Sequence, residues 1–277
     1  MNEGALGLAL AASLSWGVGD FVSGVKTRSL GVLGVLFPAQ VAGLALMAVL
    51  VGARGAPWPG NGVLWAIPAA CAGTLGLVAF FRGMATGAIS VVAPVAGVSA
   101  VIPVGFGLAA GDALGGLTAA GIAAALAGVG LASRERGSGG GLAGGVGWAL
   151  LAALGFGFYY PPLHAAATVD PYWAVFLFRC TSATLTGGAL LALRAPLPPR
   201  RELPVVALAG LLDTGGNLLY ALAASERGLV SVVSVLSSLY PIVTVALASL
   251  LLHERPAPWQ WLGVGLTFAG IGLIAAG

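Results

Sequence analysis

Charge is what this 277-residue chain lacks most. Only 8% of its residues are Asp, Glu, Lys or Arg, about a third of the fraction usual in soluble domains, while 58% are hydrophobic. So few charges cannot cover the surface of a water-soluble domain of this size. The composition therefore indicates an integral membrane protein, whose structural unit is a spanning helix of about 20 residues.

Histidine and cysteine are also scarce, with two of each. His164 and His253 are too far apart for metal-ligand spacing, and they offer no cluster of nucleophile and base. Cys71 and Cys180 fall inside apolar segments, so we expect no structural disulfide. The chain also lacks a GxxxxGK[ST] loop, so ATP is not expected to power it directly. We therefore expect no enzymatic activity, no metal and no bound cofactor.

Long uncharged segments dominate the chain. Seven are long enough to cross a bilayer once, at 29–53, 55–81, 83–111, 113–133, 137–169, 228–252 and 256–277. Three more span if one charge is tolerated, at 4–24 with Asp20, 172–193 with Arg179, and 203–225 with Asp213. Lipid offers no backbone partners and these segments lack barrel-like alternation. The sequence therefore predicts an all-α integral membrane protein with ten transmembrane helices. The start MNEGALG has no basic n-region, so no cleaved signal peptide is expected.

The two halves of the chain align with an offset of 140 to 142 residues. GAISVV at 87–92 aligns with GLVSVV at 228–233, and SWG at 15–17 aligns with GFG at 155–157. This predicts two five-helix repeats, 1–135 and 142–277, joined by a Gly-rich linker at 136–141. Because five is odd, the second repeat would enter the membrane in the opposite direction. Inverted repeats are typical of transporters with a site at midplane between the halves. Chance similarity between Gly- and Ala-rich helices is the alternative.

Several segments carry a family resemblance. FFRGMATGAISVVAPV at 80–95, GLVSVVSVLSSLYPIVTVALASLLLHE at 228–254 and WLGVGLTFAGIGLIA at 261–275 resemble the drug/metabolite transporter superfamily, in its EamA-type branch. The resemblance covers nearly the whole chain and implies a ten-helix carrier. Relatives move amino acids, sugars, nucleotide sugars, cations and drugs, so the resemblance does not fix the substrate. The first repeat of the family usually carries Glu after its fourth helix, whereas Asp112 stands here.

The distribution of Lys and Arg predicts the orientation. With the N-terminus inside, cytoplasmic loops would hold only Arg54 and Arg227. The other side would hold Lys26, Arg28, Arg134, Arg136, Arg194, Arg200, Arg201 and Arg255. Because Lys and Arg are retained in the cytoplasm, we expect both termini outside the cytoplasmic (inner) membrane, although many relatives are drawn with termini inside. The basic loops account for the net charge of +3, so no nucleic-acid partner is expected.

Four charges fall inside predicted helices, where facing lipid would cost about 2.5 to 3.5 kcal/mol each. Asp20 and Arg82 lie at similar depth and could pair, and so could Arg179 and Asp213. Asp213, near the middle of its helix, is the main candidate for binding a proton or a cation. The structural alternatives are ion pairs that only stabilise the fold and an Arg82 that extends to the interface.

Polar and aromatic residues complete a predicted cavity. Trp16 precedes Asp20 by four residues and Asn217 follows Asp213 by four, so each pair shares a helix face. The other candidates for substrate binding or coupling are Gln40, Ser90, Phe156, Ser234 and Ser238. Pro94 and Pro103 are expected to bend their helix and free carbonyl groups. Serines bonded to their own backbone are the alternative for the serine positions.

These features predict a secondary active transporter that works by alternating access. The expected cargo is a small amphipathic metabolite, an amino acid or related compound, with export favoured by the resemblance and a proton gradient as the available energy source. Organic cations, drugs or sugar-like metabolites are the alternative cargo, and a passive channel is the alternative class. The expected partners are the solute and membrane lipid, and the expected assembly is a monomer or a weak homodimer.

Overall fold

The computed structural model describes residues 3–109, 115–132, 143–225, 233, 236–237, 239–254 and 256–276. These residues form helices and connecting loops, without a strand among them. The α-helices of the first half are α1 (Glu3–Leu30), α2 (Val32–Arg54), α3 (Ala66–Thr86), α4 (Ile89–Gly97), α5 (Val101–Ala109) and α6 (Gly116–Ala132). Those of the second half are α7 (Val146–Ala167), α8 (Pro171–Ala192), α9 (Leu203–Ser225), α11 (Tyr240–Leu251) and α12 (Pro258–Ala276). Short 3-10 turns lie at Asn61–Trp65 (η1), Val98–Ala100 (η2) and Arg200–Glu202 (η3).

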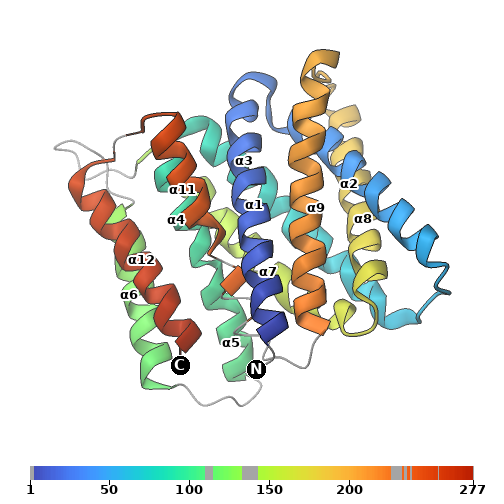
Figure 1. Ribbon diagram of the computed structural model, residues 1–277. Helices are drawn as coiled ribbons and strands as arrows, with labels where there is room; N and C mark the ends of the chain where they lie inside the picture. Colours follow the sequence, from blue (N-terminus) through green and yellow to red (C-terminus); the bar gives the residue numbers. More distant parts are fainter. Residues whose placement is uncertain are drawn as a thin grey trace.

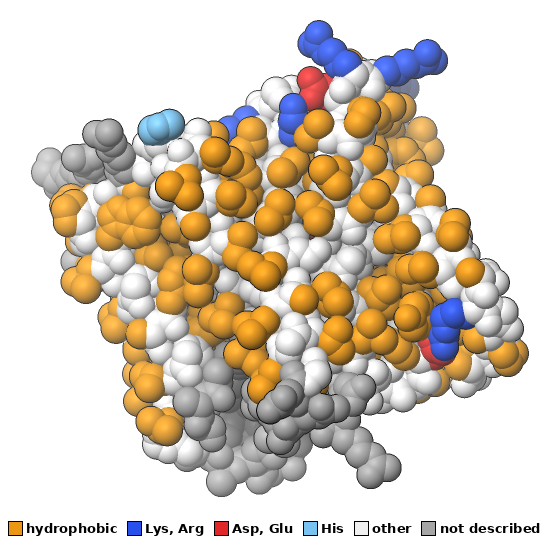
Figure 2. Space-filling model, viewed as in Figure 1, with side chains coloured by type: hydrophobic (Ala, Val, Ile, Leu, Met, Phe, Trp, Pro, Cys, Tyr) orange, Lys and Arg blue, Asp and Glu red, His pale blue; other side chains and the backbone are white. Residues whose placement is uncertain are grey.

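Six helical segments are long and apolar enough to cross a membrane. They are Gly4–Leu30, Val32–Arg54, Asn61–Thr86, Val146–Ala167, Pro171–Ala192 and Arg200–Ser225. Hydrophobic side chains cover the middle of the visible surface, and charged side chains gather toward its ends (Figure 2). Together these features confirm an all-helical, multi-pass membrane protein. The expected count of ten spanning helices is only partly met, since six described segments reach that length.

The segment expected as one helix at 83–111 is divided instead. α3 continues to Thr86, and the rest forms α4, η2 and α5. Pro103 has no N–H to donate to the carbonyl of Ser99, four residues earlier, and Pro94 lies inside α4. The α-helix therefore tightens into a 3-10 turn at 98–100, as the two prolines led us to expect.

Helices from the two halves are paired side by side. α1 packs along α9, while α3 packs along α7; α2 packs against α8, and α6 against α12. Figure 1 shows α6 and α12 together at one side of the bundle, with α1 next to α9. Most of the extensive contacts therefore join one half of the chain to the other, so the two halves share one core.

Glycines permit the closest of these approaches. A Cβ on Gly155 of α7 would lie 2.6 Å from the Cα of Gly76 on α3. On α6, a Cβ on Gly128 would lie 2.6 Å from the carbonyl oxygen of Gly263 on α12. Small residues let two helix backbones touch where lipid gives no hydrophobic drive for association. At these glycines the helices touch through their backbones rather than through large side chains.

Ion pairs lie at the helix ends. Lys26 pairs with Glu202 at 2.7 Å, and Arg28 pairs with Glu254 at 3.2 Å. Toward the other end of α2, Arg54 donates to both carboxylate oxygens of Asp170, which also accepts the backbone N–H groups that begin α8. These contacts tie helices together where they leave the apolar zone.

Candidate functional site

A cavity lies inside the bundle, between helices of both halves. Its empty volume is about 420 Å³, a figure that includes the open space at its mouth. Helices α1, α3, α7, α8, α9 and α11 contribute the lining side chains: Trp16, Asp20, Gly73, Leu77, Phe156, Tyr159, Tyr160, Phe178, Asp213, Asn217 and Tyr240. Two carboxylates therefore share one cavity whose remaining walls are aromatic, apolar or neutral.

The first carboxylate, Asp213, is held by an arginine. Nη1 of Arg179 donates to Oδ2 of Asp213 at 2.7 Å and to Oε1 of Gln40 at 2.5 Å. The Arg179 side chain is 0% exposed, whereas that of Asp213 is 21% exposed. The guanidinium also lies 5.3 Å from the centre of the Phe178 ring. The expected pair of Arg179 and Asp213 is thus present, and the arginine lies behind the carboxylate as seen from the cavity.

The second carboxylate, Asp20, does not pair with Arg82, contrary to expectation. Arg82 is exposed on the outer face of α3, where its guanidinium lies 5.1 Å from the centre of the Trp148 ring. The two residues face different directions around the bundle, which depth along a helix does not reveal. Asp20 is 5% exposed and lines the cavity, and no described side chain forms an ion pair or hydrogen bond with its carboxylate.

An amide and two rings form a hydrogen-bonded group beside Asp213. Nε1 of Trp16 donates to Oδ1 of Asn217 at 2.9 Å, and the hydroxyl of Tyr159 donates to the same oxygen at 3.3 Å. Trp16 Nε1 also lies 3.2 Å from the backbone carbonyl oxygen of Asp213. These bonds fix the tryptophan ring between α1 and α9, so the structure brings together Trp16, Asp20, Asp213 and Asn217 as expected.

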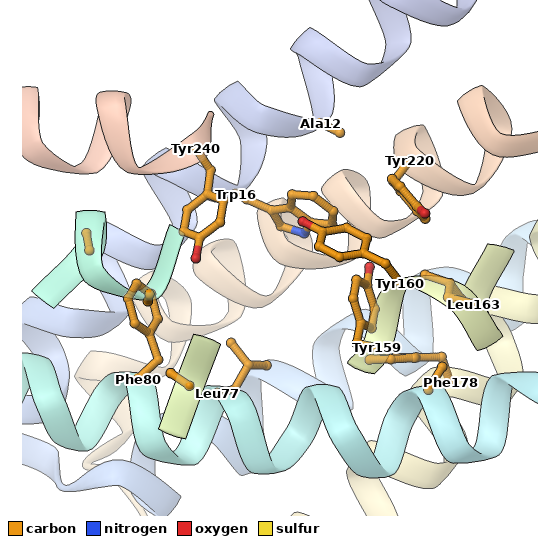
Figure 3. Packing of buried hydrophobic residues seen from close by; sticks show 14 of the residues in the cluster. Ala12, Trp16, Leu77, Phe80, Tyr159, Tyr160, Leu163, Phe178, Tyr220 and Tyr240 are labelled. Atoms are coloured by element: carbon orange, nitrogen blue, oxygen red, sulfur yellow. The ribbon is translucent and has the colours of Figure 1, made fainter. Parts of the chain in front are cut away.

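Aromatic rings surround this group. The Trp16 ring lies 6.4 Å from Tyr159, 6.1 Å from Tyr220 and 6.4 Å from Tyr240, between ring centres. Figure 3 shows Trp16 between Tyr240 and the tyrosines of α7 and α9, with Phe80 and Leu77 on the α3 side. Phe156, the expected counterpart of Trp16, lies 6.3 Å from Tyr240. Rings at these separations form edge-to-face and tilted contacts that make a rigid wall.

Three serines were expected to line the cavity, and only Ser90 lies among the described residues. Ser90 is buried at the N-terminus of α4, where its hydroxyl donates to Glu254 at 2.7 Å. The Glu254 carboxylate also accepts the backbone N–H groups of Ile89 and Ser90, at 3.1 and 2.9 Å. Ser90 therefore takes part in a helix cap instead of lining the cavity. Ser234 and Ser238 lie outside the described residues.

Some lining residues gave no signal in the sequence. Gly73, Leu77 and Phe178 are ordinary residues of apolar helices, and only the packing of α3 and α8 turns them toward the cavity. Tyr240 was visible only as the aromatic residue before Pro241. Within the described residues, no three His, Cys, Asp or Glu side chains come together in a way that could hold a metal ion.

The arrangement is suited to binding a small solute reversibly. A buried carboxylate can bind a proton or a cationic group, and the surrounding rings can bind a cation or an apolar body. Nothing in the described lining resembles a nucleophile placed next to a general base.

Comparison with known proteins agrees with this fold. A solved structure titled "Crystal structure of protein" matches with a TM-score of 0.71 over 99% of this chain and 96% of that chain, at 18% identity. At that identity the likeness concerns the fold alone. No curated protein matches the chain.

The family comparison covers the second half of the chain. Residues 143–276, from just before α7 to the end of α12, match the EamA-like transporter family. This match agrees with the EamA-type motifs at 228–254 and 261–275, and the family consists of membrane transporters of the drug/metabolite type. Through residues 143–276, the chain belongs to the EamA-like transporter family.

Proposed function

We propose that this protein is a secondary transporter that carries a small amphipathic metabolite through its central cavity by alternating access. The observation that supports this is the cavity itself, which contains two carboxylates, is lined by aromatic rings and lies between helices of both halves. Charged groups inside an apolar bundle are costly and commonly mark the path of a solute or ion. Amino acids and related compounds are the proposed cargo, moved outward, with a proton gradient as the energy source.

The packing supports two repeats related by an approximate twofold axis, 1–135 and 142–277. α1 packs on α9, and their counterparts in the other half, α7 and α3, pack on each other in the same way. The counterparts α2 and α8 pack together, and so do the counterparts α6 and α12. A Cβ on Gly216 would lie 2.5 Å from Cδ1 of Trp16, and a Cβ on Gly76 would lie 2.7 Å from Cδ1 of Phe156. Phe156 lies 140 residues after Trp16, and Gly76 lies 140 residues before Gly216, so the two contacts correspond to each other. Such repeats can exchange two conformations around a fixed site.

Cavity blocking tests whether this cavity is the path. Leu77→Trp on α3 would fill it, because Leu77 lines the cavity and is buried. Leu75→Trp is the matched control, since Leu75 lies on the same helix and is 68% exposed on the surface. In proteoliposomes loaded with amino acids, organic cations or sugars, we expect saturable counterflow for wild type and Leu75→Trp, and loss of it for Leu77→Trp.

The remaining outcomes separate the classes of protein. A flux that rises linearly with solute concentration, without counterflow, would identify a channel. Counterflow that persists in folded Leu77→Trp would mean that the solute takes another path.

The proposed location is the cytoplasmic (inner) membrane, with both termini outside and the protein acting as a monomer or weak homodimer. The excess of Lys and Arg on the side of Lys26 and Arg28 supports this orientation. Labelling a terminal tag on intact cells with a membrane-impermeant reagent tests it. If the tag is labelled only after the membrane is opened, the termini lie inside and the proposed orientation is wrong.

A further inference from the structure

We infer that the solute is an organic monocation, a primary amine on an aromatic or aliphatic body, and that Asp20 is the carboxylate that binds its ammonium group. This inference rests on the proposed transport function, but it assigns an amine as the solute in place of the amino acid proposed above. It assigns different roles to the two carboxylates of the cavity. The sequence alone had made Asp213 the cation-binding carboxylate and had paired Asp20 with an arginine, whereas here Asp20 binds the cation and Asp213 is paired.

Asp213 already has a permanent cationic partner. Arg179 donates to it at 2.7 Å, is completely buried, and is held from behind by Gln40 at 2.5 Å. An arginine stays protonated in proteins, so this pair is a fixed zwitterion with no net charge. A solute cation gains little from Asp213 because Arg179 already neutralises it.

Among the described residues, Asp20 is the cavity carboxylate without a cationic partner. Its carboxylate is 5% exposed, faces the cavity, and has no ion-pair or hydrogen-bond partner among the described residues. The titratable groups on neighbouring helices that interact electrostatically with the Asp20 carboxylate are Asp213 on α9 and Tyr240 on α11. None of the lining side chains in the described part of the chain is Lys, Arg or His. With Asp213 matched by Arg179, one negative charge is left for one cation from the solute.

The walls beside Asp20 suit the rest of such a solute. Trp16 lies four residues earlier on α1, and its ring, with those of Tyr240 and Phe156, borders the same cavity. Ring faces attract a desolvated ammonium and also pack against an apolar body. The Tyr240 hydroxyl is buried and has no hydrogen-bond partner among the described residues, so it is available to the solute.

The same geometry disfavours a zwitterionic amino acid. Its carboxylate would enter a cavity that already holds Asp20 and Asp213. The nearby cation among the described residues is Arg179, whose Nε and Nη2 atoms are buried away from the cavity surface. A like-charge contact without an accessible partner weakens binding, so an amine should bind more tightly than the amino acid of the same side chain.

The empty site needs another cation, because an isolated carboxylate removed from water is neutral unless a cation accompanies it. We therefore expect a proton on Asp20 when the solute is absent. Binding then converts the carboxylic acid and the ammonium ion into a carboxylate–ammonium pair and a free proton. One proton leaves for each amine bound, which makes Asp20 the point at which proton and solute exchange.

Calorimetry on the purified full-length protein in detergent tests this assignment. Phenethylamine is the probe, 2-phenylethanol its uncharged analogue, and L-phenylalanine the amino acid with the same side chain. Titration in two buffers of different ionisation enthalpy gives the number of protons released. The variants are Asp20→Asn, which keeps the shape of the side chain, and the double variant Asp213→Asn/Arg179→Met, which replaces the fixed pair by neutral groups.

We expect wild type to bind phenethylamine at least tenfold more tightly than either other probe and to release close to one proton at a pH where the empty site is protonated. Asp20→Asn should lose this preference and the proton release while keeping its helical circular dichroism. The double variant changes the cavity wall at Asp213, so its overall affinity can fall, but it should keep the preference for phenethylamine and the proton release. The assignment is overturned if wild type does not bind phenethylamine, or binds 2-phenylethanol or L-phenylalanine equally well. It is also overturned if folded Asp20→Asn keeps proton release, or if the double variant alone loses it.

Binding and counterflow measurements together distinguish a failure of the proposed transport function from a failure of the role assigned to Asp20. Amine binding that depends on Asp20, without counterflow of any probe in proteoliposomes, would leave the binding site in place and refute the carrier. Counterflow of phenethylamine that is unchanged in Asp20→Asn would leave the carrier in place and refute the role of Asp20.

Discussion

Removing either partner of the Arg179–Asp213 pair should destabilise the protein, but by unequal amounts. Asp213→Asn leaves a guanidinium that is 0% exposed and cannot lose its proton. Arg179→Met leaves a carboxylate that is 21% exposed at the cavity and can be neutralised by a proton. The inequality follows from the chemistry of the residue that remains.

The magnitudes follow from burial. Breaking a buried ion pair by removing one partner costs about 3–5 kcal/mol. The amide oxygen that Asp213→Asn introduces would still accept from Nη1 of Arg179, so we expect about 3 kcal/mol for this variant, the low end of that range. Arg179→Met loses the charge-assisted hydrogen bonds to Asp213 and Gln40, and we expect it to cost about 2 kcal/mol because a proton can neutralise the remaining carboxylate. The double variant should cost less than Asp213→Asn alone, since apolar or neutral groups often replace a buried pair without loss.

Equilibrium unfolding in mixed detergent micelles, followed by circular dichroism, measures these differences. Ser182→Ala on α8 is the control for losing a neutral buried contact, because its hydroxyl lies 2.8 Å from that of Thr74. It should cost about 1 kcal/mol. The reasoning is refuted if Arg179→Met costs as much as Asp213→Asn, or if the double variant costs the sum of the two.

Three further predictions concern contacts outside the cavity. Glu254→Gln should weaken the cap of α4 by about 1 kcal/mol and speed hydrogen exchange of the first amides of α4 roughly fivefold. Asp170→Asn should destabilise the protein by about 1 kcal/mol at neutral pH, measured by thermal unfolding, because it weakens the cap of α8 and removes the ion pair with Arg54. Gly155→Leu should cost about 3 kcal/mol or more in the same measurement, since its Cβ would meet the backbone of α3 at 2.6 Å.

Two of these predictions have a matched control variant. Glu202→Gln removes an ion pair on the side of Glu254, and equal exchange of α4 in both variants would contradict the cap. Gly147→Leu lies on the same helix as Gly155 with nothing within 4 Å of its Cβ, so it should be tolerated. Equal costs for the two leucine variants would contradict a close contact between α3 and α7.

The effect of Asp170 should also depend on pH. Burial alone would raise the pKa of the Asp170 carboxyl, but hydrogen bonds from Arg54 and the backbone of Trp173 and Tyr172, with the charge of Arg54, lower it below its ordinary value of 3.8. A carboxyl with a lowered pKa stabilises the folded state above its unfolded pKa and loses that contribution as pH falls through the folded pKa. The difference between wild type and Asp170→Asn should therefore be constant near neutral pH and shrink only below about pH 3.8. A difference that shrinks already between pH 7 and 5 would contradict the lowered pKa.

Helix positions were largely predictable because hydropathy is a local property. The segment 203–225 was expected from its apolar length, and α9 spans Leu203–Ser225. The pairing of Arg179 with Asp213 also followed from depth and opposite charge. The division of the segment at 83–111 was signalled by Pro94 and Pro103, but the extension of α3 to Thr86 was not, because Arg82 is charged and still lies in the helix.

The direction in which a side chain faces was not predictable. The buried positions of α3 include Gly73, Leu77, Phe80 and Met84, which form a stripe, and Arg82 lies outside it. In a soluble protein a polar opposite face would have revealed that stripe. Here both faces are apolar, since one meets lipid and the other meets protein, so the sequence pattern does not distinguish them. Ser90 and Glu254 show the same difficulty at a helix end, because their contact joins residues 164 positions apart.

The sequence by itself determined that the chain crosses a membrane as helices and that four charges lie inside the apolar segments, and it predicted that the two halves are repeats. Those properties depend on composition, on segment length and on depth along a helix. Only the tertiary structure decided that Asp213 is neutralised by Arg179 while Asp20 faces the cavity without a described partner. Which charges meet depends on the rotation of each helix about its axis, and close packing between helices sets that rotation.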